Sequence, residues 1–385
     1  MIDPQVRDLN FEQYLALIRQ FTDEELIPAE VQTDRDDAIA EPLVDRMREL
    51  GLFGISLPKT YGGLEFSMRE QALLTMEFTR ASAVYRSRFS TTIGLCSQTV
   101  LEYGTDDQRS QHLHRMAQGN LTTSFALTEE SAGSDASNIQ TRAKRDGDHY
   151  VINGTKRYIT NAPIADMFLV MAKTGDGEQE DMSVFLVPRE TPGVTPSEGY
   201  DMMGQRGSYV GGIEFKDVRV HASQLLSGAE GGGLKMSLRG INHARTHVAA
   251  TAVGQAKRLL DEALRYTAER QQFGQTINNF QAIQVMLGES YAEWCAARAL
   301  VLDVATRFDE QPRPFVDIGA AKLFATEMVG RVADRVVQMF GGAGYLNEHA
   351  VSRLYRDVRL LRLFEGTSQI NQINTAKAMI RRGYA

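Results

Sequence analysis

Apolar side chains recur at helical spacing in the first third of the chain. The period is about 3.6 residues, which predicts a helix with one apolar face, and its positions are Phe11, Leu15, Ile18 and Leu26. Pro28 is expected to close this helix, because proline breaks the helical hydrogen-bond ladder. Further helices are predicted over 41–50 and 68–81, with LPKTYGG at 57–63 as the turn between them.

The pattern changes near Leu121 to short alternating or β-branched runs. These runs occupy residues 122–127, 150–152, 157–159, 167–172, 183–187 and 212–215. Dipeptides that favour turns lie between them, at Asp146-Gly147, Asn153-Gly154 and Asp176-Gly177. Short strands separated by such turns predict a mainly antiparallel β-domain.

Beyond Gly233 the spacing becomes helical again and few helix breakers interrupt it. The long amphipathic stretches cover residues 234–270, 277–308, 314–340 and 368–382. Long helices in succession predict an antiparallel four-helix bundle. The predicted fold class is therefore α+β, with an N-terminal helical domain (1–120), a middle antiparallel β-domain (121–230) and a C-terminal helical bundle (231–385).

Composition and charge narrow the classes of function. The net charge is −7 over 385 residues, whereas a nucleic-acid-binding protein normally presents a basic face, so we expect no nucleic-acid partner. The two cysteines, Cys96 and Cys295, form no CxxC pair, which argues against a disulfide framework and a cysteine zinc site. No apolar run of about 18 residues and no signal-peptide pattern is present, so we expect a cytoplasmic protein without a membrane span.

Two segments of the β-domain have the composition of a ligand site. SFALTEESAGSD (124–135) runs from a strand into a turn of small and hydroxyl residues, where backbone can approach a ligand closely. YITN (158–161) places an aromatic ring beside a hydroxyl and an amide, which suits a flat heterocycle. An ordinary turn and an ordinary packed strand are the alternatives for the two segments.

Three segments of the C-terminal part carry further candidates. RQQFG (270–274) places Arg270 at a helix end, where it either complements the helix dipole or binds a phosphate. GGAG (341–344) lacks the spacing of a dinucleotide fingerprint and is interpreted as a helix break. No HExxH or GxSxG motif is present, so neither a metal site nor a serine nucleophile is expected.

FEGTSQ (364–369) contains the candidate base. Glu365 stands among apolar neighbours, and an apolar environment raises the pKa of a carboxyl toward the range that suits a general base. The alternative is an ordinary helix start, with Thr367 as the first residue of the last helix.

The order and spacing of these motifs resemble the acyl-CoA dehydrogenase family over nearly the whole chain. The matching segments are LTEESAGSD (127–135), NGTKRYITN (153–161), RQQFG (270–274), QAIQ (281–284), QMFGGAGY (338–345) and FEGTSQI (364–370). The resemblance implies the three-domain fold, non-covalent FAD and a homotetramer. It also implies α,β-dehydrogenation of an acyl-CoA to a trans-2-enoyl-CoA, with Glu365 as α-proton base, hydride transfer to flavin N5 and an electron-transfer flavoprotein as acceptor.

The same resemblance implies roles for individual residues. Residues expected to line the flavin within one subunit are Phe125, Leu127, Thr128, Ser134, Tyr158, Ile159, Thr160, Thr367 and Gln369. Residues expected to hold the FAD of a neighbouring subunit are Arg270, Phe273, Gln281, Gln338, Gly341 and Gly342. Residues expected to contact the acyl-CoA are Ser134, Asn242, Arg245, Gly366 and Arg86.

The sequence departs from the family pattern at a few positions. Glu130 replaces a frequent Pro, Tyr158 a frequent Trp, and Phe125 a frequent Tyr. One branch of the family places its base near residue 244, which is alanine here, so Glu365 is the only candidate base. Oxidases, desulfinases and monooxygenases share the fold, and a non-catalytic scaffold with the same fold is a further alternative.

The segment SAVYRSRFS (82–90) bears on the substrate. Arg86 and Arg88 are unexpected beside a pocket for a plain acyl chain, because an unpaired buried charge is costly. Either both point to solvent or pair with acids, or Arg86 meets a polar group at the end of the acyl chain. The YRS triplet (85–87) resembles the glutaryl-CoA dehydrogenase branch and favours a dicarboxylic substrate, with decarboxylation left open. Thr79 stands where that branch has a glutamate.

Overall fold

The computed structural model describes residues 2–175, 182–310 and 314–382. Its N-terminal part is helical, as predicted. The helices are α1 (Pro4–Arg7), α2 (Phe11–Phe21), α3 (Ile27–Asp36), α4 (Glu41–Glu49), α5 (Met68–Phe78), α6 (Val84–Ser90), α7 (Ser97–Tyr103) and α8 (Asp106–Ala117). The side chains of Asn10 and Gln13 each bond the other's backbone N–H and so cap the start of α2.

Pro28 does not end the first helix, which corrects the prediction. A π-helical segment, η1 (Thr22–Leu26), continues from α2 into α3, and Pro28 is the second residue of α3. Proline removes one helical N–H, and the π-helical segment directly before Pro28 is where the backbone departs from the regular i→i−4 hydrogen bonds.

The middle part is a seven-stranded, mainly antiparallel sheet, as predicted. Its strands are β1 (Thr123–Ala126), β2 (Arg142–Asp146), β3 (His149–Thr160), β4 (Met167–Lys173), β5 (Met182–Pro188), β6 (Val194–Pro196) and β7 (Val210–His221). The order is β1-β4-β2-β3-β7-β6, with β5 pairing β4. Only the β1–β4 ladder and a single β2–β4 pair are parallel among the described strands.

The predicted turn at Asn153-Gly154 is instead part of one long strand, β3. The ladder with β7 shifts register between Ile152 and Gly154, so the glycine marks an irregularity within the strand. A Cβ at Gly154 would lie 2.3 Å from Thr141 Oγ1, which explains the glycine by close approach. Gly147 does form a turn, between β2 and β3. The predicted turn at 176–177 lies outside the described residues.

The C-terminal part is a helical bundle built on α9 (Gly233–Glu269), α10 (Gln281–Arg307), α11 (Phe315–Phe340) and α13 (Ser368–Arg382). A fifth helix, α12 (Ala350–Arg359), was not predicted. A small hairpin, β8 (Gln271–Gln272) and β9 (Gln275–Thr276), joins α9 to α10. The domain boundaries at 120/121 and 230/231 stay predictions.

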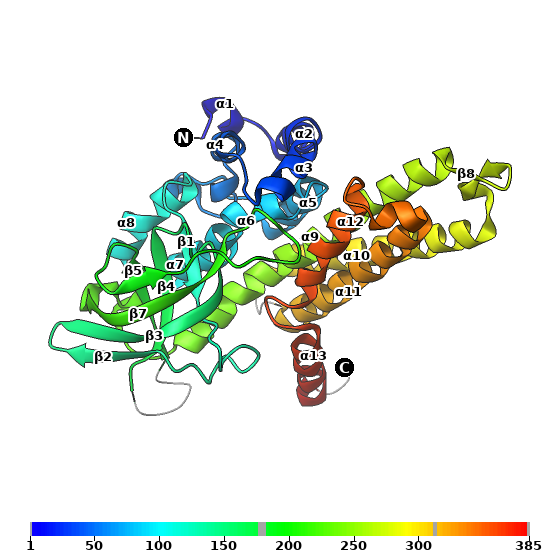
Figure 1. Cartoon of the computed structure of the whole chain (residues 1–385). Coiled ribbons are helices and arrows are strands. Elements are labelled where there is room, and N and C mark those ends of the chain that lie inside the picture. Colours follow the sequence, from blue (N-terminus) through cyan, green and yellow to red (C-terminus); the bar gives the residue numbers. More distant parts are fainter. Residues whose placement is uncertain (1, 176–181, 311–313, 383–385) are drawn as a thin grey trace.

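Helix α9 connects the parts of the molecule. Figure 1 shows the sheet and the far end of the bundle at opposite ends of this helix, with the N-terminal helices beside its middle. Helix α9 packs against α5, α11 and the π-helical segment η4 (Thr91–Cys96), and η4 also packs against β1. The α6–η4 segment is thereby held between the sheet and the bundle.

Candidate functional site

Glu365 lies in a short loop between the 3-10 segment η10 (Leu360–Arg362) and α13. Its backbone is left-handed, with φ of 54°, and Gly366 follows with φ of 88°. A left-handed conformation is uncommon for a residue with a side chain and is found disproportionately at functional sites. Among the described residues, none accepts a hydrogen bond from the Glu365 backbone N–H.

Side chains from two helices of the bundle hold this loop. Arg245 Nε on α9 donates to the Glu365 carbonyl oxygen at 2.8 Å. Lys322 Nζ on α11 donates to the Gly366 carbonyl oxygen at 2.9 Å, and Asn371 Nδ2 on α13 donates to the same oxygen at 2.8 Å. A Cβ at Gly366 would lie 3.0 Å from Arg245 Nη2, so glycine fits both the backbone conformation and the contact.

Burial governs the charge state of Glu365. Desolvation raises the pKa of its carboxyl to about 7, against the opposing effect of Arg245, Lys322 and Arg86. A carboxyl with a pKa close to neutral pH is well matched to proton transfer from a weak carbon acid.

Arg86 on α6 is buried, so the alternative that its side chain points to solvent is wrong. Its guanidinium has no carboxylate within 4.0 Å among the described residues, and its Nε has no hydrogen-bond acceptor there. Burial lowers the pKa of Arg86 to about 10, and the Glu365 carboxylate opposes this. The neighbouring Ser87 Oγ is likewise buried without a partner.

Arg88 is also buried, but it faces a different environment. Its Nη2 lies 3.9 Å from the Glu41 carboxylate, and its guanidinium lies 5.7 Å from the centre of the Tyr209 ring. The alternative of pairing with an acid is therefore right for Arg88 and wrong for Arg86.

The flavin-lining residues predicted in the β-domain lie on two neighbouring segments. Ser124 Oγ on β1 donates to the Thr160 carbonyl oxygen at 2.8 Å, and Arg157 N on β3 donates to the Thr128 carbonyl oxygen at 2.9 Å. These bonds bring one group of predicted residues close to another: Phe125, Leu127 and Thr128 near Tyr158, Ile159 and Thr160. Ser134 is exposed on the loop that follows β1.

Tyr158 differs from the other residues of this group in its backbone conformation and its exposure. Its backbone is left-handed, with φ of 57°, and 64% of the residue is exposed. An aromatic ring left open at the end of a bulged strand offers a face to a planar ligand.

A buried ion pair fixes the loop that carries Ser134. Lys156 Nζ, fully buried on β3, lies 2.7 Å from Glu129 Oε1 and 3.2 Å from the Leu127 carbonyl oxygen. The Glu129 carboxylate also accepts from Gln140 N, Thr141 N and Thr141 Oγ1. This pair was not expected from the sequence, because Lys156 falls between the predicted strands 150–152 and 157–159.

The second predicted flavin set lies at the far end of the bundle, around the β8–β9 hairpin in Figure 1. The Tyr266 and Phe340 rings stack 4.0 Å apart and join the end of α9 to the end of α11. The predicted residues beside this junction are all exposed: Arg270, Phe273, Gln281, Gln338, Gly341 and Gly342. Within one chain they are separated from the sheet by the length of α9.

Other predicted residues have structural partners in this chain. Thr367 Oγ1 accepts from Ile370 N at 3.3 Å, so the helix-start alternative holds for Thr367, and Gln369 is exposed one turn into α13. The Asn242 Oδ1 accepts from Arg245 Nη1 at 2.8 Å. Contacts of Asn242 and Arg245 with CoA stay a prediction.

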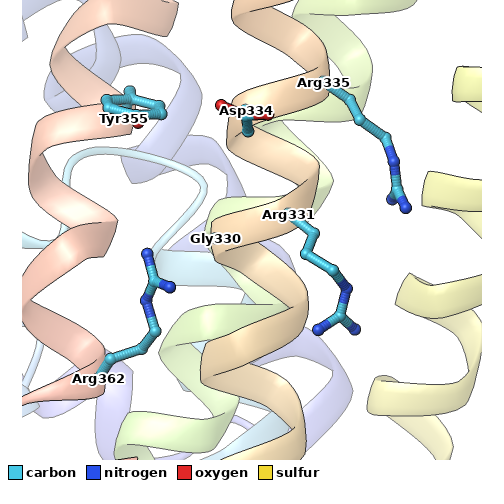
Figure 2. Close-up of a pocket in the computed structure, with 6 residues that line it drawn as sticks. All are labelled: Gly330, Arg331, Asp334, Arg335, Tyr355 and Arg362. Atoms are coloured by element: carbon cyan, nitrogen blue, oxygen red, sulfur yellow. The ribbon is translucent and has the colours of Figure 1, made fainter.

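A separate surface pocket lies on α11 and α12. Figure 2 shows its lining, with Arg331 and Arg335 extending to one side of α11 and Arg362 and Tyr355 on the other. Arg331 and Arg335 each pair with Glu293, and Arg362 lies 3.4 Å from Glu327. These three arginines are therefore paired with carboxylates.

Other classes of site are not found in the part of the chain that the structure describes. Within residues 2–175, 182–310 and 314–382, no group of His, Cys, Asp and Glu side chains is arranged to hold a metal ion. Cys96 and Cys295 are both free thiols. No described helix is both long and apolar enough to cross a membrane.

Comparisons with known proteins agree with this architecture. Three family models match in order: the N-terminal domain of acyl-CoA dehydrogenase at residues 10–120, the middle domain at 124–218 and the C-terminal domain at 231–380. The probable acyl-CoA dehydrogenase YngJ of Bacillus subtilis is 38% identical, covering 97% of this chain and 99% of its own length.

Two further relatives differ in the reaction that their names describe. Subunit CarC of the caffeyl-CoA reductase-Etf complex of Acetobacterium woodii is 32% identical, over 95% of this chain and 97% of its own. The crystal structure of a glutaryl-CoA dehydrogenase from Mycobacterium smegmatis in complex with FADH2 superimposes with a TM-score of 0.91, at 29% identity, over 97% of this chain and 95% of its own. With all three domains matched in order, this chain belongs to the acyl-CoA dehydrogenase family and is an oxidoreductase of that flavoprotein family.

Proposed function

We propose that the protein catalyses FAD-dependent α,β-dehydrogenation of an acyl-CoA thioester to a trans-2-enoyl-CoA, with Glu365 as the base for the α-proton. The observation that carries the proposal is the Glu365 carboxyl itself. It is held in a strained loop, and burial raises its pKa to about 7. A carboxyl of this kind is half ionised near neutral pH and can take a proton from a weak acid.

The β-domain residues fit an isoalloxazine ring. Tyr158 leaves an aromatic ring exposed, and Gly133 and Ser134 are exposed on the loop after β1, so both segments are accessible to a ligand. In this proposal the flavin contacts are Phe125, Leu127, Thr128, Ser134, Tyr158, Ile159, Thr160, Thr367 and Gln369. A flavin bound there supplies the two-electron acceptor to which the β-hydrogen leaves as hydride at N5.

The remaining FAD contacts come from a second subunit in this proposal. Arg270, Phe273, Gln281, Gln338, Gly341 and Gly342 are exposed at an end of the bundle that their own sheet does not reach. A guanidinium such as that of Arg270 binds phosphate oxygens in a bidentate manner, so it suits the pyrophosphate. A homotetramer follows as the expected assembly.

The protein's own groups provide the acid–base chemistry. The Glu365 N–H, which has no acceptor among the described residues, is available to the thioester carbonyl oxygen and would stabilise the enolate as the α-proton leaves. The Glu365 carboxylate takes that proton. Arg245 and Lys322 keep the base loop in place through the Glu365 and Gly366 carbonyl oxygens.

The direction of the reaction is part of the proposal. The caffeyl-CoA reductase relative carries the name of an enzyme that reduces an enoyl thioester. The same glutamate serves either direction, because a base that removes the α-proton returns it in the reverse reaction. We propose dehydrogenation, with an electron-transfer flavoprotein as acceptor, which agrees with the Etf partner in that relative's name, and we expect the protein in the cytoplasm.

An absorbance spectrum and one assay panel test the proposal. Bound flavin gives visible bands, whereas a non-catalytic scaffold would be colourless as purified. The panel should test saturated acyl-CoAs with an artificial electron acceptor. It should also test enoyl-CoAs with reduced electron-transfer flavoprotein as the electron donor. Turnover of the enoyl-CoAs alone would overturn the proposed direction.

A second candidate function is preference for a dicarboxylic acyl-CoA. Among the described residues, Arg86 Nε and the Ser87 hydroxyl are buried without hydrogen-bond partners, and both can donate to a terminal carboxylate. Thr79 counts against this candidate, because it stands where the glutaryl-CoA dehydrogenase branch has a glutamate. Its own hydroxyl is buried and donates to the Thr75 carbonyl oxygen at 2.6 Å.

A further inference from the structure

Lys322 occupies an unexpected place in the bundle. It lies on α11 with 0% of its surface exposed, on the helix side that also contains Ile318, Ala325 and Val329. Its Nζ donates to the Gly366 carbonyl oxygen at 2.9 Å. No carboxylate lies within 4.0 Å of this ammonium among the described residues, so it has a carbonyl partner and no ion pair.

Structural stability alone does not explain a lysine at this position. Lysine is almost never fully buried unless it is paired, because removing an ammonium from water is costly. A Leu or Met at 322 would fill similar space beside the apolar neighbours without that cost. The Gly366 carbonyl oxygen would still be satisfied, since Asn371 Nδ2 donates to it at 2.8 Å.

The charges around Glu365 come from each of the elements that face it. Arg86 faces it from α6, Arg245 from α9 and Lys322 from α11, and the thiol of Cys96 faces it from η4. Of the three cations, Arg86 forms no hydrogen bond with the base loop among the described residues. Arg245 and Lys322 instead bond two successive carbonyl oxygens of the base loop.

We propose that Lys322 is a positioning residue for the reaction, whose ammonium fixes the left-handed Glu365–Gly366 turn and favours the charged form of the Glu365 carboxyl. This inference rests on the proposed role of Glu365 as base. Lys322 does not touch the substrate and acts only through the loop and its charge.

The directions of the two pKa shifts agree with this role. Burial raises the pKa of Glu365 to about 7 while Lys322 and the two arginines oppose the rise. Burial lowers the pKa of Lys322 to about 8, with Glu365 and Glu327 opposing this shift and Arg245 adding to it, so the lysine and the Glu365 carboxylate each favour the other's charged form. Removing the lysine charge must therefore raise the pKa of Glu365 further.

The test compares Lys322→Gln, which keeps a hydrogen-bond donor without the charge, with Lys322→Met, which removes both. Lys257→Gln is the matched control, because Lys257 is a partly exposed lysine paired with Asp261 on α9 and the change in net charge is the same. The measurement is the pH profile of kcat/KM on the flavin-loaded protein. A second measurement, independent of flavin, titrates the Glu365 carboxyl band by infrared difference spectroscopy, assigned by its loss in Glu365→Gln.

We expect both Lys322 variants to shift the midpoint of the acidic limb to higher pH by about one unit, because the pKa of a carboxyl rises when a nearby positive charge is removed. A pKa of about 8 in place of about 7 lowers kcat/KM near pH 7 by about fivefold, and the loss recovers at higher pH. The infrared titration should move in the same direction, and Lys257→Gln should move neither.

The opposite outcomes are equally clear. A loss of rate at every pH with an unmoved limb and an unmoved carboxyl band would mean that Lys322 is structural only, and the inference would be wrong. If Glu365→Gln itself remained active, the proposed base would be wrong, whatever the Lys322 variants did.

Discussion

Arg245 and Glu365 are 120 residues apart in sequence, yet Arg245 Nε donates to the Glu365 carbonyl oxygen at 2.8 Å. The bond joins α9 to the loop before α13 and so connects the start of the bundle with its end. It uses the backbone of Glu365 and leaves the carboxyl free for proton transfer. A residue predicted to contact CoA thus has a second task in the structure, which is to hold the base loop.

Glu365→Gln should fold and bind flavin but lose about 10²–10⁴-fold in kcat, the usual contribution of a positioned general base. The amide is nearly the same size and cannot accept the α-proton. Steady-state assays and the flavin spectrum check both halves of this prediction. Activity within about threefold of wild type would exclude Glu365 as the base, since a general base contributes far more.

The activity should depend on pH through Glu365. Because the carboxylate form is the base and its pKa is raised to about 7, kcat/KM should rise with pH through this region and level off above it. A profile already flat from pH 5 upward would mean that the carboxyl ionises at its ordinary pKa and is not the titrating base.

Arg270→Ala should lose FAD and shift the assembly from tetramers toward dimers or monomers. The reason is that this exposed arginine is proposed to bind the pyrophosphate of FAD held by a neighbouring subunit. Flavin content and light scattering measure the two effects. Arg265→Ala is the control on the same helix, with its side chain 67% exposed. A fully loaded, tetrameric Arg270→Ala protein would disprove the shared-site role of this arginine.

Arg86→Leu should change substrate preference. If the buried guanidinium binds a terminal carboxylate, glutaryl-CoA should be preferred to octanoyl-CoA, and the substitution should lower kcat/KM for glutaryl-CoA by about 10- to 100-fold. Butyryl-CoA should be affected less. Arg88→Leu serves as control, because Arg88 is on the same helix but pairs with Glu41. A preference for octanoyl-CoA that Arg86→Leu leaves unchanged would remove Arg86 from substrate recognition.

Glu129→Gln should destabilise the β-domain. It leaves Lys156 buried without its counter-charge, and breaking a buried ion pair costs about 3–5 kcal/mol. Thermal unfolding and flavin content report the effect on the domain and on the loop that carries Ser134. The double variant Glu129→Leu/Lys156→Leu should recover stability but not flavin binding, because it removes the unpaired charge without restoring the loop contacts. Equal stability of Glu129→Gln and wild type would contradict this view of the pair.

The class and order of the elements could be predicted from the amino-acid sequence, because hydrophobic spacing is a local property of the chain. The long helices α9, α10 and α11 and the strands β1, β4 and β5 were found within a few residues of their observed ends. The sequence did not predict β2 and β6, it divided β3 into two runs, and it covered only part of β7. Two predictions from local sequence were wrong: a helix end at Pro28 and a turn at Gly154. In both places the conformation depends on the surrounding chain. Glu365 was a candidate only through its apolar neighbours and the family resemblance.

The charges around the site could not be predicted from the sequence, because they depend on how the chain folds. That Arg86 is buried without a carboxylate, that Arg88 pairs with Glu41, and that Lys322 bonds the Gly366 carbonyl oxygen depend on contacts between residues far apart in sequence. The free energy of a charge depends on its desolvation and on the charges within a few ångströms. Neither quantity is encoded in a residue's near neighbours along the chain, so the side chains that set the pKa of Glu365 emerged only when α6, α9 and α11 were brought together.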